Sequence, residues 1–199
     1  MNIGIDTDGV LTDLYGFNYE IGTKVIKQEL INPSGYNLKE MYGVKKSWEL
    51  FHGLKCFFEY SKNWPPREKA PEMIRQLKND GHRLNEITAR KFVTMKNPLG
   101  WYSKYLLKKW YDKYEMKFDE IILCSEKNAP EEKLKGCIQT GCKVMIEDKP
   151  DVAELLAANG IQILLFDAPY NQLVKGENIT RVYNWEDVYE ELQLIANEQ

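Results

Sequence analysis

A short apolar run opens the chain, and from about residue 71 onward further apolar runs alternate with amphipathic segments. The apolar runs lie at 2–6, 82–88, 120–124, 143–148, 161–166 and 179–183. Apolar residues recur at helical spacing over 71–81, 98–114, 130–140, 152–160 and beyond Asn184. This alternation predicts strands and helices in turn, and unbroken apolar strands are typical of a parallel sheet covered on both faces. We therefore expect an α/β fold, a Rossmann-like three-layer sandwich.

Residues 14–70 do not follow this alternation. The segment is helix-like, broken at 32–35 and at 64–66, and rich in aromatic residues. We expect it to form a small helical cap inserted after the first strand. The core domain would then comprise residues 1–13 and 71–199.

Composition narrows the class of protein and of partner. The chain has 199 residues, of which 43% are hydrophobic, so one compact domain with a modest insertion is expected. Its net charge of -3 and pI near 5.6 disfavour binding to a nucleic-acid polymer but not to a small phosphorylated molecule. Whether the chain forms a homodimer is left open by the sequence.

The N-terminus and the cysteines indicate a cytoplasmic protein. The first residues lack a basic flank and a long apolar run, so they do not resemble a signal peptide. No stretch approaches the ~20 apolar residues that span a bilayer, which predicts no membrane partner. The four cysteines form no CxxC pair, so we expect reduced, buried thiols rather than a disulfide framework or zinc site.

The candidate chemistry lies in carboxylates at the ends of strands. There is no GxSxG or GxGxxG motif and there are only two histidines, which disfavours histidine-based triads. Parallel strands open on one edge of a sheet, and this edge would collect Asp6, Asp8, Thr88, Glu147 and Asp148. Two carboxylates ~4 Å apart repel by about 4 kcal/mol at an effective dielectric near 20. Such a cluster favours a hard divalent ion with oxygen ligands, preferably Mg²⁺.

Each of these positions also has an ordinary structural explanation. Asp6 and Asp8 are good turn formers, and Asp148 precedes Lys149-Pro150, so it would suit a helix cap. Lys133 lies in a charged run that reads as a solvated helix face. The functional interpretation rests on their combination, because separate strand ends deliver Asp-x-Asp, Thr and an acidic pair in chain order.

That order carries a resemblance to a known superfamily. The motifs are Asp6-Thr7-Asp8-Gly9-Val10, Ile87-Thr88-Ala89-Arg90, Lys133 and Ile146-Glu147-Asp148. They resemble the motif pattern of the haloacid dehalogenase superfamily of aspartate-nucleophile phosphohydrolases over nearly the whole chain. Within it, the cap and three stretches resemble the 5′(3′)-deoxyribonucleotidase (cytosolic type C) family. These stretches are Glu147-Asp148-Lys149-Pro150, Leu165-Phe166-Asp167-Ala168-Pro169-Tyr170-Asn171 and Arg181-Val182-Tyr183-Asn184-Trp185.

The resemblance implies a set of catalytic roles. Asp6 would attack phosphorus to form an aspartyl-phosphate, and Asp8 would act first as acid and then as base. Mg²⁺ would be held by Asp6, the backbone carbonyl of Asp8, and Asp148. The chain differs from the family in having polar Asn85-Glu86 in its second strand and Glu-Asp in place of an Asp-Asp pair.

The resemblance also implies how substrate would be bound. Gly9 would let the backbone approach the phosphate, while Thr88, Ala89 and Lys133 would bind its oxygens. The cap would cover the site, with Phe17 or Trp64 stacking on a base.

The implied function is that of a Mg²⁺-dependent phosphomonoester hydrolase, a 5′(3′)-deoxyribonucleotidase acting on nucleoside monophosphates. One alternative is a phosphatase of the same chemistry for another small phosphoester, because the cap sets the substrate. Another is a non-catalytic, receiver-like phosphate-binding module. A second acid at Asp8 together with a lid favours turnover over that alternative.

Overall fold

The centre of the molecule is a parallel sheet of six strands, which a computed structural model describes within residues 1–197, the side chains of 49 and 50 excepted. The strands are β1 (Asn2–Ile5), β2 (Arg83–Thr88), β3 (Glu120–Leu123), β4 (Val144–Glu147), β5 (Gln162–Phe166) and β6 (Ile179–Val182). They lie in the order β3-β2-β1-β4-β5-β6, and every neighbouring pair is parallel.

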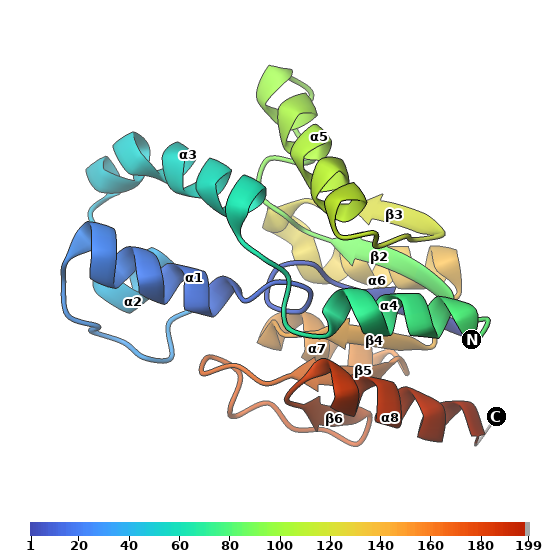
Figure 1. Cartoon of the computed structure of the whole chain (residues 1–199). Helices are drawn as coiled ribbons and strands as arrows, with labels where there is room; N and C mark the ends of the chain where they lie inside the picture. Colours follow the sequence, from blue (N-terminus) through green and yellow to red (C-terminus); the bar gives the residue numbers. More distant parts are fainter. Residues whose placement is uncertain (198–199) are drawn as a thin grey trace.

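Helices cover both faces of this sheet (Figure 1). On one face, α4 (Ala70–Asn79), α5 (Pro98–Lys113) and α8 (Trp185–Asn197) pack against side chains such as Ile3, Leu84 and Ile146. On the other face, α6 (Ala129–Thr140) and α7 (Pro150–Ala158) pack against Met145 and Leu165. The predicted three-layer α/β sandwich is confirmed.

Local signals in the sequence set several helix ends. Pro71 lies in the first turn of α4, where its missing N–H would have no helical partner. Asn184 accepts a hydrogen bond from the Asp187 N–H at 2.8 Å, so it caps α8 as expected. All four cysteines are free and buried, which agrees with the reduced thiols that the sequence indicated.

The two edge strands differ from the expected pattern of full burial. β3 and β6 lie at the edges of the sheet; Ile121 in β3 is 48% exposed, and β6 is only partly buried before Val182. An edge strand has only one neighbour, so an apolar run there need not be covered on both sides.

The segment that we expect to act as a cap, residues 14–70, is built mainly from helices, and we refer to it as the cap. They are α1 (Leu14–Ile21), a π-helical turn η1 (Gly22–Ile26), α2 (Leu38–Tyr42) and α3 (Lys46–Asn63). Its side chains form two apolar clusters of their own, one around Phe17 and Tyr60 and one around Met41 and Tyr42. In Figure 1 these helices lie to one side of the sandwich, opposite both chain termini.

The strand order places a ligand-binding edge beside β1. The chain leaves β1 toward β2 and β3 on one side, and later forms β4, β5 and β6 on the other. The carboxyl ends of β1 and β4 are thus neighbours at the point where strand order reverses, which is where open α/β sheets bind ligands.

No helix within residues 1–197 is both long and apolar enough to cross a membrane.

Candidate active site

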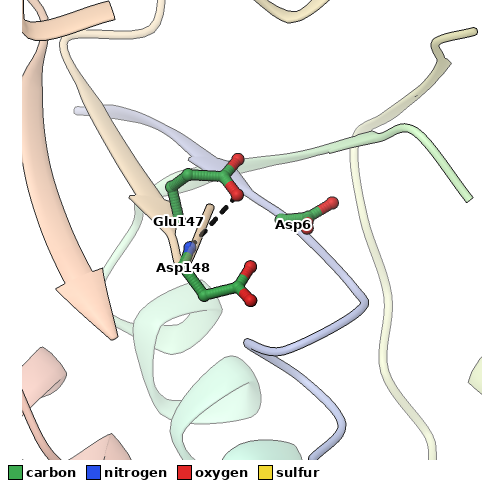
Figure 2. A group of neighbouring side chains, drawn as sticks. All are labelled: Asp6, Glu147 and Asp148. Atoms are coloured by element: carbon green, nitrogen blue, oxygen red, sulfur yellow. Dashed lines mark hydrogen bonds between the residues drawn. The ribbon is translucent and has the colours of Figure 1, made fainter. Parts of the chain in front are cut away.

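Three carboxylates gather at the adjoining ends of β1 and β4. Asp6 follows β1, Glu147 ends β4 and Asp148 comes next. One oxygen from each lies within 4.8 Å of the others, and all three residues are buried (Figure 2). We refer to Asp6, Glu147 and Asp148 as the acidic trio. Burial and the neighbouring carboxylates Glu147 and Asp6 raise the pKa of Asp148 well above its usual range.

Lys133 is tied to two members of the acidic trio. Its ammonium nitrogen lies 2.9 Å from Asp6 Oδ1 and 2.6 Å from Glu147 Oε2, and the side chain is almost wholly buried. Burial alone would lower the pKa of Lys133, but the carboxylates of Asp6 and Glu147 outweigh it and raise this pKa. Lys133 is therefore not part of a solvated helix face, the ordinary explanation that the sequence left open.

The two acids at the end of β4 have different surroundings. Glu147 Oε2 contacts Lys133, and Oε1 accepts hydrogen bonds from the backbone N–H of Asp148 and of Lys149, both at 3.1 Å. Both Glu147 oxygens are therefore engaged by the protein. Asp148 Oδ1 is buried and has no hydrogen-bond partner among the residues that the structure describes.

The loop after β5 fixes the other atoms of Asp148. The Tyr170 hydroxyl donates to Asp148 Oδ2, and the Asn171 side-chain amide donates to the Asp148 carbonyl at 2.7 Å. The free Oδ1 and the like charge of Asp6 nearby make a set of hard oxygen donors that would gain from a divalent cation. The acidic trio therefore fits Mg²⁺, with Asp148 the better ligand of the adjacent pair.

Gly9 has a structural requirement beyond the one that the sequence indicated. Its φ is +93°, and a Cβ there would lie only 1.9 Å from Asp148 Oδ2. The space left by the missing side chain is taken by the Asp148 carboxylate. Approach of the Gly9 backbone to a phosphate stays a prediction.

The side chain of Asp8 is held apart from the acidic trio. Its Oδ1 accepts a hydrogen bond from the Tyr60 hydroxyl at 2.9 Å and lies 3.5 Å from Arg90 Nε. Burial raises the pKa of Asp8, while the Arg90 charge opposes that rise. A metal ligand at this position would have to be the Asp8 backbone, as the sequence suggested.

Thr88 and Ala89 lie at the end of β2, beside β1. Thr88 is fully buried, and its Oγ1 has no hydrogen-bond partner in the described chain. A buried hydroxyl without a partner is costly unless a ligand uses it, which marks this atom as a candidate phosphate contact.

Part of this site opens into a cavity of about 380 Å³, which we term the active-site cavity, while Glu147 and Asp148 lie outside its lining. Its lining from the core includes Asp6, Asp8, Thr88, Ala89 and Lys133. Its lining from the cap includes Phe17, Tyr36, Trp48, Phe57 and Tyr60. The volume lies in the usual range for a small-molecule site, about 300 to 1,000 Å³, which suits one small ligand.

The two aromatic residues singled out in the sequence are placed differently. Phe17 lines the active-site cavity, whereas Trp64 is not among the residues around it. Trp64 packs edge-on against Phe17, with ring centroids 5.1 Å apart, and its indole N–H donates to the Asp13 carbonyl at 3.0 Å. Trp64 thus supports Phe17 within the cap's own apolar cluster.

Several residues of the site were given no role by sequence reasoning. Tyr60 and Tyr36 reach the cavity from the cap. Their sequence signals were weak, because one aromatic among many in the cap looks like core. Arg90, after β2, was quoted only as part of a motif, and the structure places it beside Asp8. Tyr170 was part of a stretch quoted only for its family resemblance, and the structure gives that stretch a physical role beside Asp148.

The buried carboxyl of Glu86 is hydrogen-bonded to the loop that follows β1. Glu86 in β2 is fully buried and accepts a hydrogen bond from the Thr7 hydroxyl at 2.7 Å, while Tyr111 lies 2.7 Å from the same hydroxyl. Burial raises the pKa of Glu86 to about 7. Of the polar pair in the second strand, Glu86 therefore has a partner in the residue between Asp6 and Asp8, while the Asn85 side-chain amide donates to Cys142 Sγ at 3.5 Å.

Comparison with known families identifies the chain's relatives. The sequence model of the family described as 5′ nucleotidase, deoxy (pyrimidine), cytosolic type C protein matches residues 1–199. The chain belongs to this family. It is accordingly a nucleotidase, a hydrolase of phosphoric monoesters in the haloacid dehalogenase superfamily. Membership of an enzyme family disfavours the receiver-like alternative.

Curated relatives of this nucleotidase are distant but match along most of its length. A nucleotidase of Clostridium acetobutylicum is 26% identical, covering 95% of this chain and 92% of its own. A protein of Chlorobaculum tepidum, provisionally named 5′(3′)-deoxyribonucleotidase, is 23% identical, covering 94% of this chain and 88% of its own.

Solved structures support the fold of this nucleotidase. A haloacid dehalogenase superfamily hydrolase from Geobacter sulfurreducens matches with a TM-score of 0.56 and 16% identity, covering 96% of this chain and 98% of its own. The D,D-heptose 1,7-bisphosphate phosphatase from B. bronchiseptica matches with a TM-score of 0.58 and 11% identity, covering 98% of both chains. That phosphatase was solved with magnesium and phosphate.

Proposed function

We propose that this nucleotidase uses Mg²⁺ and an aspartate nucleophile, Asp6, to hydrolyse nucleoside monophosphates, with deoxy forms preferred. The observation that carries the proposal is that Asp6, Asp8, Thr88 and Lys133 line one cavity beneath the aromatic cap. Family membership supports the substrate class.

Asp6 and Asp8 divide the chemistry between them. An Asp6 oxygen forms a bond to phosphorus as the bond from phosphorus to the sugar oxygen breaks. Asp8 donates its own proton to the departing sugar oxygen. A water that loses its proton to Asp8 then attacks phosphorus, which releases phosphate and restores the Asp6 carboxylate. The separate surroundings of Asp6 and Asp8 support these different roles.

The residues that would hold Mg²⁺ are Asp6, the backbone carbonyl of Asp8, and Asp148. The cation would offset the charge of the buried carboxylates and of the phosphate dianion. Asp148 is favoured over Glu147 because its Oδ1 has no other partner, whereas both Glu147 oxygens are engaged. Glu147 instead holds Lys133 in place.

Three groups are positioned to bind the transferred phosphoryl group. The Thr88 hydroxyl is buried without a partner, the Ala89 N–H follows it in the chain, and the Lys133 ammonium lies beside Asp6. Their donors would stabilise negative charge on the equatorial oxygens during transfer. Because Lys133 is fixed by Glu147, little reorganisation is needed at that moment.

The cap supplies the means to recognise the leaving group. Phe17 borders the cavity and offers an aromatic face for a nucleobase, supported from behind by Trp64.

The buried, reduced cysteines fit the cytoplasmic location that the sequence favoured.

Phosphate release from a panel of substrates tests this function. The panel comprises ribo- and deoxyribonucleoside 5′- and 3′-monophosphates and sugar phosphates, each with Mg²⁺. We expect kcat/KM to be highest for a deoxyribonucleoside monophosphate. A higher kcat/KM for a sugar phosphate would favour the alternative of another small phosphoester.

A further inference from the structure

Tyr60 connects the cap to the residue that we assign as acid and base. It lies in α3 of the cap, is buried, and donates a hydrogen bond to Asp8 Oδ1 at 2.9 Å. Its hydroxyl also contacts the hydroxyl of Thr12, and Thr12 in turn lies 3.1 Å from the carbonyl of Thr7. A continuous chain of hydrogen-bonding atoms therefore runs from Asp8 through two hydroxyls to the backbone.

We propose that Tyr60 and Thr12 are positioning residues that keep Asp8 hydrogen-bonded both as carboxylate and as carboxylic acid. The proposal rests on the acid and base role given to Asp8 under the proposed function. It assigns to two residues, one of them in the cap, a part in proton transfer to the leaving group.

Counting protons shows how one geometry serves both forms. When Asp8 is ionised, the Thr12 hydroxyl donates to Tyr60 and the Tyr60 hydroxyl donates to Asp8 Oδ1. When Asp8 carries a proton on Oδ1, it donates to Tyr60, Tyr60 donates to Thr12, and Thr12 donates to the Thr7 carbonyl. Only the hydroxyl hydrogens rotate, because each hydroxyl is both donor and acceptor.

Arg90 cannot hydrogen-bond to Asp8 in both of its protonation states. Its Nε lies 3.5 Å from the same Asp8 oxygen, but a guanidinium only donates, so it favours the ionised form alone. It does hold Tyr60 in place, since its central carbon lies 4.8 Å from the centre of the Tyr60 ring. The reversible part of the contact to Asp8 therefore belongs to the hydroxyls.

The chemistry of the leaving group separates positioning of Asp8 from a general structural effect. A sugar alkoxide is a poor leaving group and needs the proton from Asp8, whereas 4-nitrophenolate leaves without one. Loss of correct Asp8 geometry should therefore slow release of a nucleoside far more than release of 4-nitrophenolate. Hydrolysis of the aspartyl-phosphate uses Asp8 as base with either substrate, so the two substrates are compared in the first turnover.

The test compares Tyr60→Phe with wild type on the best nucleotide of the panel and on 4-nitrophenyl phosphate. The rate measured is that of leaving-group release in the first turnover, before the aspartyl-phosphate is hydrolysed. We expect nucleoside release to slow by roughly tenfold to 100-fold, part of the 10² to 10⁴ that an acid or base contributes. We expect release of 4-nitrophenolate to stay within about twofold, since that step does not use the proton. Equal losses in the two first-turnover rates would overturn the proposal.

Tyr42→Phe is the matched control. Tyr42 is a buried cap tyrosine whose hydroxyl donates to the Tyr19 carbonyl and which does not line the cavity. It should keep both activities. Thr12→Val should repeat the selective loss seen with Tyr60→Phe, and Thr12→Ser should restore activity because it returns the hydroxyl.

A double variant keeps the proposal testable on the nucleotide alone. If Tyr60 acts through Asp8, adding Tyr60→Phe to Asp8→Asn should lower kcat no further, and independent multiplication of the two losses would contradict this. If Asp8→Asn itself spares nucleotide hydrolysis, the proposed function has failed. If Asp8→Asn is impaired while Tyr60→Phe is not, only the positioning proposal has failed.

Discussion

Gly9 and Asp148 share one small space: a Cβ on Gly9 would lie 1.9 Å from Asp148 Oδ2. The loop after β1 therefore permits the metal-binding geometry through the absence of a side chain. Asp148 must lie here for its carboxylate to approach Asp6, and Tyr170 holds it from the other side.

Gly9→Ala should therefore impair metal binding. We expect Mg²⁺ affinity, measured by titration calorimetry, to fall at least about tenfold, because displacing a ligand's supports typically costs 10- to 100-fold. The matched control is Gly81→Ala. Gly81 has a similar φ of +83° but no neighbour within 4 Å of an added Cβ. Both variants should carry backbone strain of about 1 to 3 kcal/mol, so equal Mg²⁺ affinity in the two would refute the role of the Asp148 contact.

Glu86 should make stability depend on pH. Its pKa is raised from about 4.5 to about 7, mainly by burial, so the folded protein keeps a proton that the unfolded chain releases. The free energy of unfolding should then fall as pH rises from about 4.5 to 7, by about 3 kcal/mol in total. Glu86→Gln cannot titrate there. Urea denaturation at pH 5 and 8 should show wild type losing stability relative to this variant, and a constant difference would contradict the prediction.

Lys133 should be needed for phosphate binding and for stability of the site. Lys133→Met keeps the side chain's bulk but leaves Asp6 and Glu147 without their shared cation. We expect kcat/KM to fall sharply. The free energy of unfolding of the metal-free protein should fall by about 3 to 5 kcal/mol, the usual cost of breaking a buried pair. Lys135→Ala and Lys127→Ala replace exposed lysines nearby and should behave as wild type. Similar kcat/KM in Lys133→Met and Lys135→Ala would move the role elsewhere.

Phe17 and Trp64 should separate substrate recognition from packing. Phe17→Leu should raise KM for a nucleotide by about fivefold or more, since stacking contributes about 1 to 3 kcal/mol per base. It should spare glycerol phosphate, which has no base. Trp64→Leu tests packing alone, because Trp64 lies behind Phe17 and off the cavity. If the two variants changed KM equally on both substrates, base stacking on Phe17 would be excluded.

The fold could be predicted because its signals are local. Apolar runs and helical periodicity recur with clear ends, such as Pro71 in the first turn of α4 and Asn184 before α8. The motif residues could be predicted to meet because parallel strands share one carboxyl edge. The contacts between these residues could not be predicted. Whether Glu147 or Asp148 keeps an oxygen for a metal ion depends on the contact of Lys133 with Glu147, and that contact follows from the packing of α6.

The cap was the part least open to sequence reasoning. Its aromatic residues look alike in a sequence, and only three-dimensional packing separates Phe17 at the cavity from Trp64 behind it. The role of Gly9 was likewise hidden, because its space is filled by a residue 139 positions later in the chain.

The most direct test of the central claim is detection of the phosphoryl group on Asp6. In Asp8→Asn the water that resolves the aspartyl-phosphate lacks its base, so the intermediate should accumulate when its formation needs no acid. Asp8→Asn is therefore incubated with Mg²⁺ and 4-nitrophenyl phosphate, whose leaving group departs without a proton, then quenched in acid and digested for mass spectrometry. We predict that the peptide containing residue 6 gains one phosphoryl group, and that Asp6→Asn/Asp8→Asn does not. A phosphoryl group on another residue, or none at all while 4-nitrophenolate is still released, would contradict an Asp6 nucleophile.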